Sequence, residues 1–403
     1  MADQVIMGDP ATGSLPAPVI TRLATEMADP TSDVGASLSG TFVPQSGSRT
    51  TVLGDSLDVS AKGWFPYFTI RGSIPVARNA GVGGERLDQQ LLRFDADVAL
   101  YQPDIVVFGG ATNDLSQNFT LATIRANIEA ISDAILAIGA IRVVRTCPPT
   151  DNTPVSWTLT EHRDRIAAHN AWLKDWAATR GITVLDIHEF LVDPLTGGYV
   201  SGKSDDGIHP NEAAYSAIAD GLLIGGLPAP FRSVFSLGTT VTDAVNLFPN
   251  GVCALDSSSN GLPDSWAKAN VTVSLVTDSA IVGKWLHCAN STGAIGTVNN
   301  DAPSSGFSVG DHVQIAARVK ASAATWTTPA TEGVRLILQF SGGGIQLNIA
   351  DYVHEGLDGI VSYEQIVPAG TTAIKFQIQT VGKVGETTDV NQLTGRNLTR
   401  LRA

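Results

Sequence analysis

The stretch Thr51-Val-Leu-Gly54-Asp55-Ser56-Leu57 carries a short apolar segment directly into a Gly-Asp-Ser turn. We predict a strand over Arg49–Leu53, with Ser56 just beyond its carboxyl end. Open α/β sheets place their ligand crevices at the carboxyl ends of the strands, so Ser56 falls where a site is expected. A serine hydroxyl is a weak nucleophile unless a positioned base takes its proton. The stretch therefore predicts the first strand of a parallel sheet and a candidate nucleophile at its edge.

Strand and helix patterns alternate from about residue 49 to residue 228. The further strand candidates are short apolar runs that end in Gly, Pro or polar residues: Asp104–Phe108, Ile141–Arg145 and Ile182–Ile187. Apolar residues recur at three- and four-residue spacing over 121–135 and 163–179, which is typical of amphipathic helices. This alternation predicts an α/β domain with a parallel sheet between layers of helices.

The pattern changes after Pro228. Residues His312–Lys320 and Ala373–Gln379 alternate apolar with polar side chains, and Val334–Phe340 is a further strand candidate. Such alternation is typical of antiparallel strands with one buried face, so we predict a β-sandwich. Residues 1–48 are rich in Pro, Gly, Ser, Thr and Asp and cannot bury enough surface to fold alone. We therefore predict a connector (1–48), an α/β domain (49–228) and a β-sandwich accessory domain (229–403).

A candidate base for the serine lies far downstream, in Asp205-Asp206-Gly207-Ile208-His209-Pro210. His209 directly precedes a predicted helix, and Pro210 suits the first turn of that helix. Asp206, three residues before His209, can orient one ring nitrogen and leave the other for the serine. Asp205 is adjacent and remains an alternative for this role.

Together these blocks resemble the SGNH (GDSL) family of serine hydrolases and esterases. The first block of the family corresponds to Gly54-Asp55-Ser56-Leu57, and the last corresponds to Asp206-x-x-His209. The second block resembles Asn79-Ala-Gly81-Val-Gly-Gly84, where Gly84 is the better match for the family's glycine and Gly81 the second choice. The third block, usually Gly-x-Asn-Asp, corresponds to Ala111-Thr-Asn113-Asp114, with alanine in place of the glycine.

The resemblance implies a three-layer, flavodoxin-like domain and a Ser-His-Asp acyl-enzyme mechanism. Ser56 would attack an ester carbonyl, His209 would transfer the proton, and Asp206 would orient His209. The oxyanion hole would consist of the backbone N–H groups of Ser56 and Gly84 and the side chain of Asn113. The resemblance implies no metal and no other cofactor.

The C-terminal segment resembles jelly-roll carbohydrate-binding modules at 246–251, 260–266 and 367–375. This likeness implies sugar binding, with three tryptophans as stacking candidates: Trp266, Trp285 and Trp326. We expect Trp266 to lie in the core instead. The loop Asp256–Asp264 is rich in oxygen-bearing side chains, which leaves both a calcium site and a structural turn open.

Composition excludes some classes of partner. The 403 residues include 26 Lys and Arg against 39 Asp and Glu, for a net charge of −13. Long-range repulsion therefore argues against nucleic acid and anionic membrane surfaces, and no apolar run is long enough to span a bilayer. The first residues lack the pattern of a secretory signal, and the localisation stays open.

The cysteines fit either a Cys253–Cys288 disulfide or, with Cys147, three free buried thiols.

The expected substrate is an O-acylated polysaccharide or a small neutral ester. Loops at 116–118, 151–157 and 197–204 are polar and short of aliphatic side chains, which favours acetyl groups over fatty chains. The arrangement also resembles tail-associated esterases of bacteriophages, which implies a virion tail location and other tail proteins as partners; a homo-oligomer stays open. The alternatives are a lipase or thioesterase of broad specificity, and an adhesive tail protein whose α/β domain is inactive.

We expect His162 and His169, in a charged helical stretch, to be solvated.

Overall fold

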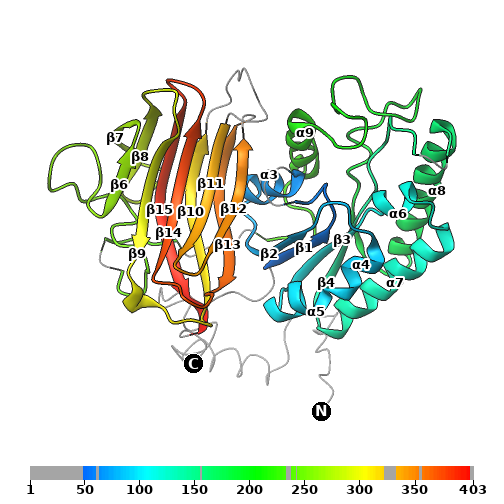
Figure 1. Cartoon of the computed structure of the whole chain (residues 1–403), viewed down its shortest axis with the longest axis horizontal. Helices are drawn as coiled ribbons and strands as arrows, with labels where there is room; N and C mark the ends of the chain where they lie inside the picture. Colours follow the sequence, from blue (N-terminus) through cyan, green and yellow to red (C-terminus); the bar gives the residue numbers. More distant parts are fainter. Residues whose placement is uncertain are drawn as a thin grey trace, which may run out of the picture. The chain divides into compact units, whose positions relative to one another are not determined.

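The computed structural model describes residues 49–59, 63–154, 157–232, 237–241, 243–321, 333–353 and 356–399 (Figure 1). The predicted connector, 1–48, lies outside the described residues. Residues 47–403 form one compact unit by their internal contacts. This unit contains a parallel sheet with helices and, after it in the chain, two antiparallel sheets.

The parallel sheet has five strands in the order β2-β1-β3-β4-β5. This is the doubly wound order of flavodoxin-like folds, which confirms the predicted fold class. The strands are β1 (Thr50–Gly54), β2 (Val76–Gly81), β3 (Ile105–Gly109), β4 (Ile141–Arg145) and β5 (Thr183–Leu185). The helices of this part are α3 (Trp64–Arg71), α4 (Leu87–Leu92), α5 (Phe94–Asp97), η1 (Ala99–Tyr101), α6 (Thr112–Ser116), α7 (Leu121–Ala137), α8 (Leu159–Ala178) and α9 (Glu212–Leu223).

Helices cover both faces of this sheet. Alternate strand residues point to opposite faces, and Val52 and Leu53 accordingly belong to different apolar clusters. The Val52 cluster includes residues of α3 and α9, whereas the Leu53 cluster includes residues of α4, α7 and α8. β1 and β3 are buried along their whole length and contain no charged residue, and their predicted bounds agree with the structure to within one residue.

In the parallel sheet, the strand that the sequence patterns missed is β2. Its residues Val76-Ala-Arg-Asn-Ala-Gly81 include Arg78 and Asn79, so they form neither an apolar run nor an apolar–polar alternation. The start of α9 also differs from the prediction. Asn211 caps this helix by accepting a hydrogen bond from the N–H of Ala214, and Pro210 lies before the cap.

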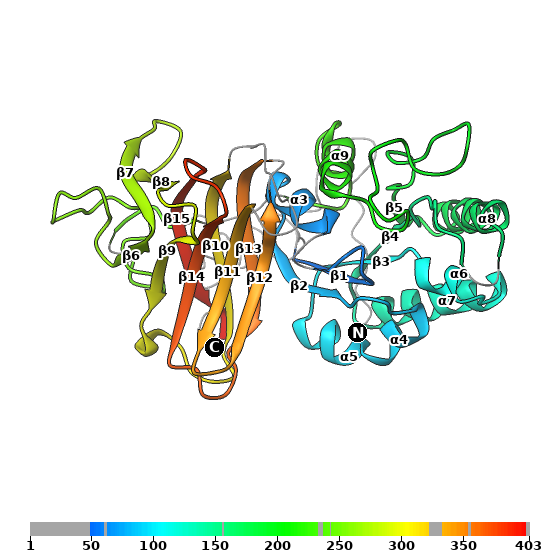
Figure 2. The same cartoon turned by 45° about the horizontal axis from the view of Figure 1, so that its top comes forward.

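The C-terminal part consists of two five-stranded antiparallel sheets, ordered β13-β10-β15-β8-β7 and β12-β11-β14-β9-β6 (Figure 2). Apolar residues from both sheets belong to one buried cluster, which confirms the predicted β-sandwich. Its elements are β6 (Trp266–Ala269), β7 (Val271–Thr277), β8 (Lys284–Asn290), β9 (Gly296–Ala302), η2 (Ser304–Gly306), β10 (His312–Ala321), β11 (Gly333–Ser341), β12 (Ile345–Val353), β13 (Leu357–Ile366), β14 (Ala373–Val381) and β15 (Thr387–Asn397). The three strands predicted here correspond to β10, β11 and β14.

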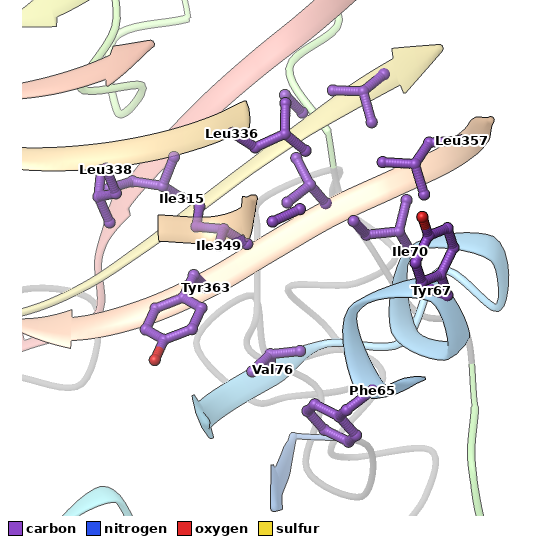
Figure 3. Packing of buried hydrophobic residues seen from close by; sticks show 14 of the residues in the cluster. Phe65, Tyr67, Ile70, Val76, Ile315, Leu336, Leu338, Ile349, Leu357 and Tyr363 are labelled. Carbon is purple, nitrogen blue, oxygen red and sulfur yellow. The ribbon is translucent and has the colours of Figure 1, made fainter. Parts of the chain in front are cut away.

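An edge strand of the sandwich, β13, packs against α3 and β2 of the α/β part. Figure 3 shows Tyr67 and Ile70 of α3 beside Leu357 of β13. The hydroxyl of Tyr363 accepts a hydrogen bond from the N–H of Asn79 at 3.2 Å. The two parts thus share one buried apolar cluster, and the boundary at residue 228 stays a prediction.

Candidate active site

Ser56 and His209 lie within hydrogen-bonding distance of each other. Ser56 occupies the turn directly after β1, and its Oγ is 2.9 Å from His209 Nε2. The other ring nitrogen of His209, Nδ1, is 2.7 Å from Asp206 Oδ2. The fold therefore joins three side chains that are up to 153 positions apart into one hydrogen-bonded chain.

Asp206, and not its neighbour Asp205, contacts the imidazole. The second carboxylate oxygen of Asp206 accepts the backbone N–H groups of Ile208 and His209 at 2.8 and 2.7 Å. Partial burial alone would raise the pKa of Asp206, but these hydrogen bonds outweigh it and lower the pKa from 3.8 to about 2. Asp206 is therefore an anion at neutral pH, whereas Asp205 accepts a hydrogen bond from the Asn211 side chain.

Further hydrogen bonds hold the backbone around His209 in the loop before α9. Ser204 Oγ donates to the carbonyl of His209 at 2.7 Å, and Tyr199 Oη donates to the carbonyl of Ile208 at 2.7 Å. The Asn211 cap then fixes the point where the helix begins. His209 thus lies between Ile208 and Asn211, which are both held by hydrogen bonds, as a base with a fixed orientation requires.

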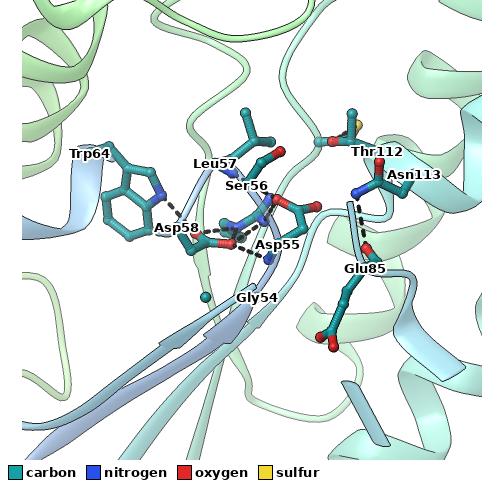
Figure 4. A network of polar contacts seen from close by, with 12 residues as sticks. Gly54, Asp55, Ser56, Leu57, Asp58, Trp64, Glu85, Thr112 and Asn113 are labelled. Carbon is teal, nitrogen blue, oxygen red and sulfur yellow. Dashed lines mark hydrogen bonds and ion pairs between the residues drawn. The ribbon is translucent and has the colours of Figure 1, made fainter. Parts of the chain in front are cut away.

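The predicted oxyanion donors lie on neighbouring loops. Asn113 is in the first turn of α6, and its Nδ2 donates to the carbonyl of Glu85 at 2.9 Å (Figure 4). Since an amide NH₂ carries two protons, this bond leaves one N–H for a ligand. Asp114 Oδ2 accepts the N–H of Leu87 at 3.1 Å, so the third block holds the loop that contains Gly84.

Gly84 and Gly81 differ in their surroundings. Gly84 is exposed, has a φ of +79° and offers open space around its Cα, which suits a loop that approaches a ligand. Gly81 lies at the end of β2, where a Cβ would come within 2.6 Å of the Asp58 backbone. Of these two glycines, Gly84 is thus the exposed one, and Gly81 has a packing role.

Ala111 occupies a strained backbone position. Its φ and ψ are 74° and 24°, in the left-handed region that glycine adopts without cost. This is the position at which the family usually has glycine. The turn into α6 therefore contains an alanine in a backbone conformation that is unfavourable for a residue with a Cβ.

A buried ionic cluster beneath Ser56 was not predicted. Asp55, Asp58 and the guanidinium of Arg145 are almost completely inaccessible and contact one another. Burial raises the pKa of Asp55 to about 6, because desolvation outweighs the attraction of Arg145. The signal in the sequence was an arginine at the carboxyl end of β4, directly after the buried Val143 and Val144.

A cavity of about 240 Å³ lies next to the candidate site. Two of its lining residues, Thr112 and Ile208, directly precede Asn113 and His209 in the sequence. The other residues that line it are Ser116, Pro148, Pro149, Thr150, Asn152, Pro154, His162 and Ile166. Much of this wall is proline and isoleucine, so it is less polar than the loop sequences predicted.

The prediction that His162 and His169 are solvated is wrong. Their side chains lie on the inner face of α8 and are 3% and 0% exposed. Burial lowers the pKa of both, and that of His169 falls to about 4. The prediction failed because the buried face of α8 is wider than its apolar residues alone indicate.

The stacking tryptophans predicted in the sandwich are largely buried where they are described. Trp266, as expected, lies in the core, and its Nε1 donates to the carbonyl of Asn250 at 3.3 Å. Trp285 is also buried and packs beneath the ammonium group of Lys320. Trp326 lies outside the described residues. Neither Trp266 nor Trp285 therefore presents a free face to a sugar.

The loop 256–264 is held together by its own hydrogen bonds. The carboxylate of Asp256 accepts the N–H groups of Asn260 and Gly261, and that of Asp264 accepts hydrogen bonds from Ser257. These bonds account for both carboxylates and favour the structural turn over a calcium site. Within the described ranges, no three His, Cys, Asp or Glu side chains gather as metal ligands.

The three cysteines are all buried free thiols: Cys147, Cys253 and Cys288. This is the second of the two arrangements that the sequence left open. In the part of the chain that the structure describes, none of the helices has the length and apolar character needed to cross a bilayer.

Comparisons with known proteins find similarity in the α/β part of the chain. Residues 46–217 match the GDSL-like lipase/acylhydrolase family. No curated protein matches the chain. Similar solved structures include a GDSL-like lipase from Bacteroides thetaiotaomicron (19% identity, 47% of this chain and 95% of the other, TM-score 0.38). Others are a lipase/acylhydrolase from Enterococcus faecalis (23%, 43% and 95%, 0.34) and a catalytic mutant of an acetylxylan esterase from Geobacillus stearothermophilus (16%, 48% and 99%, 0.37). The side chains of the candidate site thus lie in the segment of this chain that matches the GDSL-like lipase/acylhydrolase family.

Proposed function

We propose that this protein is a serine ester hydrolase in which Ser56 is the nucleophile, His209 the general base and Asp206 the residue that orients His209. The observation that carries the proposal is the hydrogen-bonded chain from Ser56 Oγ through His209 to Asp206, at the carboxyl end of β1. A serine with such a neighbour is an activated nucleophile, whereas an isolated serine is not.

The proposed reaction proceeds in two halves. Ser56 Oγ attacks the acyl carbon while its proton passes to His209 Nε2, and the carbonyl oxygen becomes an oxyanion. That oxyanion is held by the N–H groups of Ser56 and Gly84 and by Asn113. The intermediate collapses to an acyl-serine as His209 returns the proton to the leaving alcohol. Water then attacks the acyl-serine by the same route and releases the acid.

For the substrate, we propose short acyl groups, acetyl above all, on a polysaccharide. The side chains of His209 and Asp206 are 40% and 53% exposed, so a large hydrated substrate can approach the site without a lid. A neutral sugar chain also meets no repulsion from a protein of net charge −13.

The cavity supports a second candidate, an esterase of broader specificity for longer acyl groups. Its volume of about 240 Å³ is that of roughly eight water molecules at about 30 Å³ each, which is more than an acetyl group fills. Each methylene buried there would contribute about 0.8 kcal/mol to binding. The proline and isoleucine side chains in its wall could bury such a chain.

One substrate panel separates these candidates. We would measure kcat/KM on 4-nitrophenyl esters from acetate to palmitate, together with acetate release from acetylated xylan and bacterial polysaccharides, with Ser56→Ala as the blank. The first candidate predicts a maximum at acetate and a steep fall beyond butyrate. A maximum at octanoate or palmitate would establish the second candidate. If no ester is hydrolysed above the blank, the hydrolase proposal itself is wrong.

A further inference from the structure

Directly beneath the Ser56 turn lies a cluster of four buried side chains, which we call the Arg145 cluster: Asp55, Asp58, Trp64 and Arg145. Arg145 is at the carboxyl end of β4, and its Nε donates to both carboxylate oxygens of Asp58 at 2.9 and 3.1 Å. Its Nη2 contacts Asp58 as well and lies 3.2 Å from Asp55 Oδ1. Trp64 Nε1 donates to Asp58 Oδ1 at 3.0 Å, which completes the cluster (Figure 4).

The carboxylates of this cluster hold the backbone on both sides of Ser56. Asp58 Oδ2 accepts the N–H of Asp55 at 3.2 Å, and Asp55 Oδ1 accepts the N–H of Leu57 at 3.0 Å. The N–H of Asp58 donates in turn to the carbonyl of Asp55 at 3.1 Å. The residues before and after the nucleophile are therefore tied to two carboxylates that Arg145 holds in place.

The strand ends are shaped around the same cluster. A Cβ on Gly54 would collide with the carboxylate of Asp58, and a Cβ on Gly110 would collide with the guanidinium of Arg145. Gly81 is likewise closed off by the backbone of Asp58. Gly54 at the end of β1 and Gly110 directly after β3 thus leave the space that the side chains of Asp58 and Arg145 occupy, whereas Gly81 at the end of β2 leaves space for the backbone of Asp58.

We propose that Asp58 and Arg145 are positioning residues for Ser56; this inference rests on the proposed function. Buried ion pairs are costly to desolvate and contribute little to net stability when compared with apolar packing. This pair instead fixes the turn on which Ser56 Oγ must reach both His209 and the substrate carbonyl. A displacement of about 1 Å at such a position costs on the order of 10² in rate.

The test uses Arg145→Met, Arg145→Lys and Asp58→Asn in the full chain. Arg49→Met is the matched control, because Arg49 is a buried arginine paired with a buried carboxylate, Glu364, at the opposite end of β1. We would measure kcat and KM with 4-nitrophenyl acetate, the melting temperature, and hydrogen exchange at the backbone amides of Asp55 and Leu57.

We expect Arg145→Met and Asp58→Asn to lower kcat by about 10- to 100-fold, with KM changed less than about twofold. Arg145→Lys should recover part of kcat, and the two amides should exchange faster in Arg145→Met. The control should lower the melting temperature and leave kcat and the two amides as in the unaltered protein.

Three results would overturn the proposal. One is a folded Arg145→Met or Asp58→Asn protein with unaltered kcat, and another is an equal loss of kcat in the Arg49→Met control. The third is failure of both cluster variants to fold at low temperature, which would make the cluster a requirement of folding. If the unaltered protein hydrolyses no ester, the proposed function fails, and the exchange rates still report whether the cluster holds the turn.

Discussion

Two buried arginine–carboxylate clusters lie at the two ends of β1, and they differ in what they join. At the start of the strand, Arg49 makes a two-point contact with Glu364, at 2.7 and 2.6 Å, across 315 positions of the chain. Beyond the other end, roughly 16 Å away along five strand residues, Arg145 contacts the carboxylates next to Ser56. The first cluster connects the α/β part to the sandwich, and the second shapes a single turn. The same kind of ion pair therefore connects the α/β part to the sandwich at one edge of the sheet and positions the Ser56 turn at the other edge.

The carboxylates of the two clusters also differ in their protonation. Burial alone would raise the pKa of Glu364, but hydrogen bonds from Arg49 and His312 outweigh it and lower the pKa. Asp55 shares its arginine with Asp58, so burial prevails and raises its pKa to about 6. One cluster is thus fully ionic at neutral pH and remains so in mild acid, whereas the other gains a proton there.

The largest expected effect comes from removing the reacting groups at the carboxyl edge. Ser56→Ala and His209→Ala should each lower kcat/KM by about four to six orders of magnitude, since the nucleophile and its base act as a unit. Melting temperatures should stay close to that of the unaltered protein, because both side chains are partly exposed. Ester hydrolysis assays and circular dichroism melts measure the two quantities. Substantial residual turnover in either variant would contradict the assignment of that residue.

A smaller effect is expected for Asn113→Ala at the same edge. Losing one oxyanion donor typically costs about 10²–10³ in kcat, with little change in KM. Gln117→Ala is the control, since it removes an exposed amide at the end of the same short helix. Steady-state kinetics would separate the two parameters. A change in KM alone would place Asn113 in substrate binding and outside the oxyanion hole.

At the other end of β1, we expect Glu364→Gln to lower the stability of the protein and to leave kcat unchanged. Breaking a buried ion pair typically costs about 3–5 kcal/mol, here because Arg49 would keep a buried charge with a weaker partner. The free energy of unfolding, from urea titrations, should fall by an amount of this order while kcat is retained at temperatures where the variant is folded. A loss of kcat in the folded variant would mean that the two ends of β1 are coupled, and the contrast between the clusters would fail.

The pH dependence of stability should have opposite signs for the two clusters. Glu364 has a lowered pKa, so its contribution is present above its unfolded pKa of about 4.5 and is lost as pH falls through its folded value. Asp55 has a raised pKa, so the folded state binds the extra proton between about pH 4 and 6, and its contribution falls as pH rises through that window. We expect the difference in unfolding free energy between the unaltered protein and Asp55→Asn to fall by roughly 1–3 kcal/mol from pH 4 to 6.

The matching difference for Glu364→Gln should shrink as pH falls below about 4.5. Urea titrations at steps of half a pH unit would measure both differences. Curves that change in the same direction for the two variants would refute the contrast in protonation. Glu364 faces three side chains, those of His312, Gln314 and Arg49. The unaltered protein and the Glu364→Gln variant both keep all three.

The smallest expected effect tests strain at the carboxyl edge. Ala111→Gly should stabilise the protein by about 0.5–1 kcal/mol, because relief of the left-handed conformation exceeds the backbone entropy that glycine loses. Ala126→Gly, in the exposed middle of α7, is the control and should destabilise by about 1 kcal/mol. Chemical denaturation would measure both. If the two substitutions change stability alike, Ala111 stores no strain.

Part of the candidate site was accessible from sequence because its residues are set by local context. Ser56 lies in the turn after a short buried strand, and Asp206 is three positions before His209, so one short loop brings these two together. The Arg145 cluster was not accessible in this way. Arg145 and Asp58 are 87 positions apart, and their contact depends on β1, β3 and β4 being adjacent and in register.

The sequence by itself thus predicted the alternation of strands and helices in the α/β part, the change to antiparallel strands after it, and Ser56, Asn113 and His209 as candidate site residues. These follow from periodicity and from short motifs, which act over a few residues. Only the tertiary structure decided that His162, His169 and Trp285 are buried, and that Arg49 and Arg145 pair with distant carboxylates. Burial and ion pairing depend on which surfaces pack together, and this packing is a property of the whole chain. Each long-range contact closes a long loop at a cost in entropy, and the rest of the packing must offset that cost.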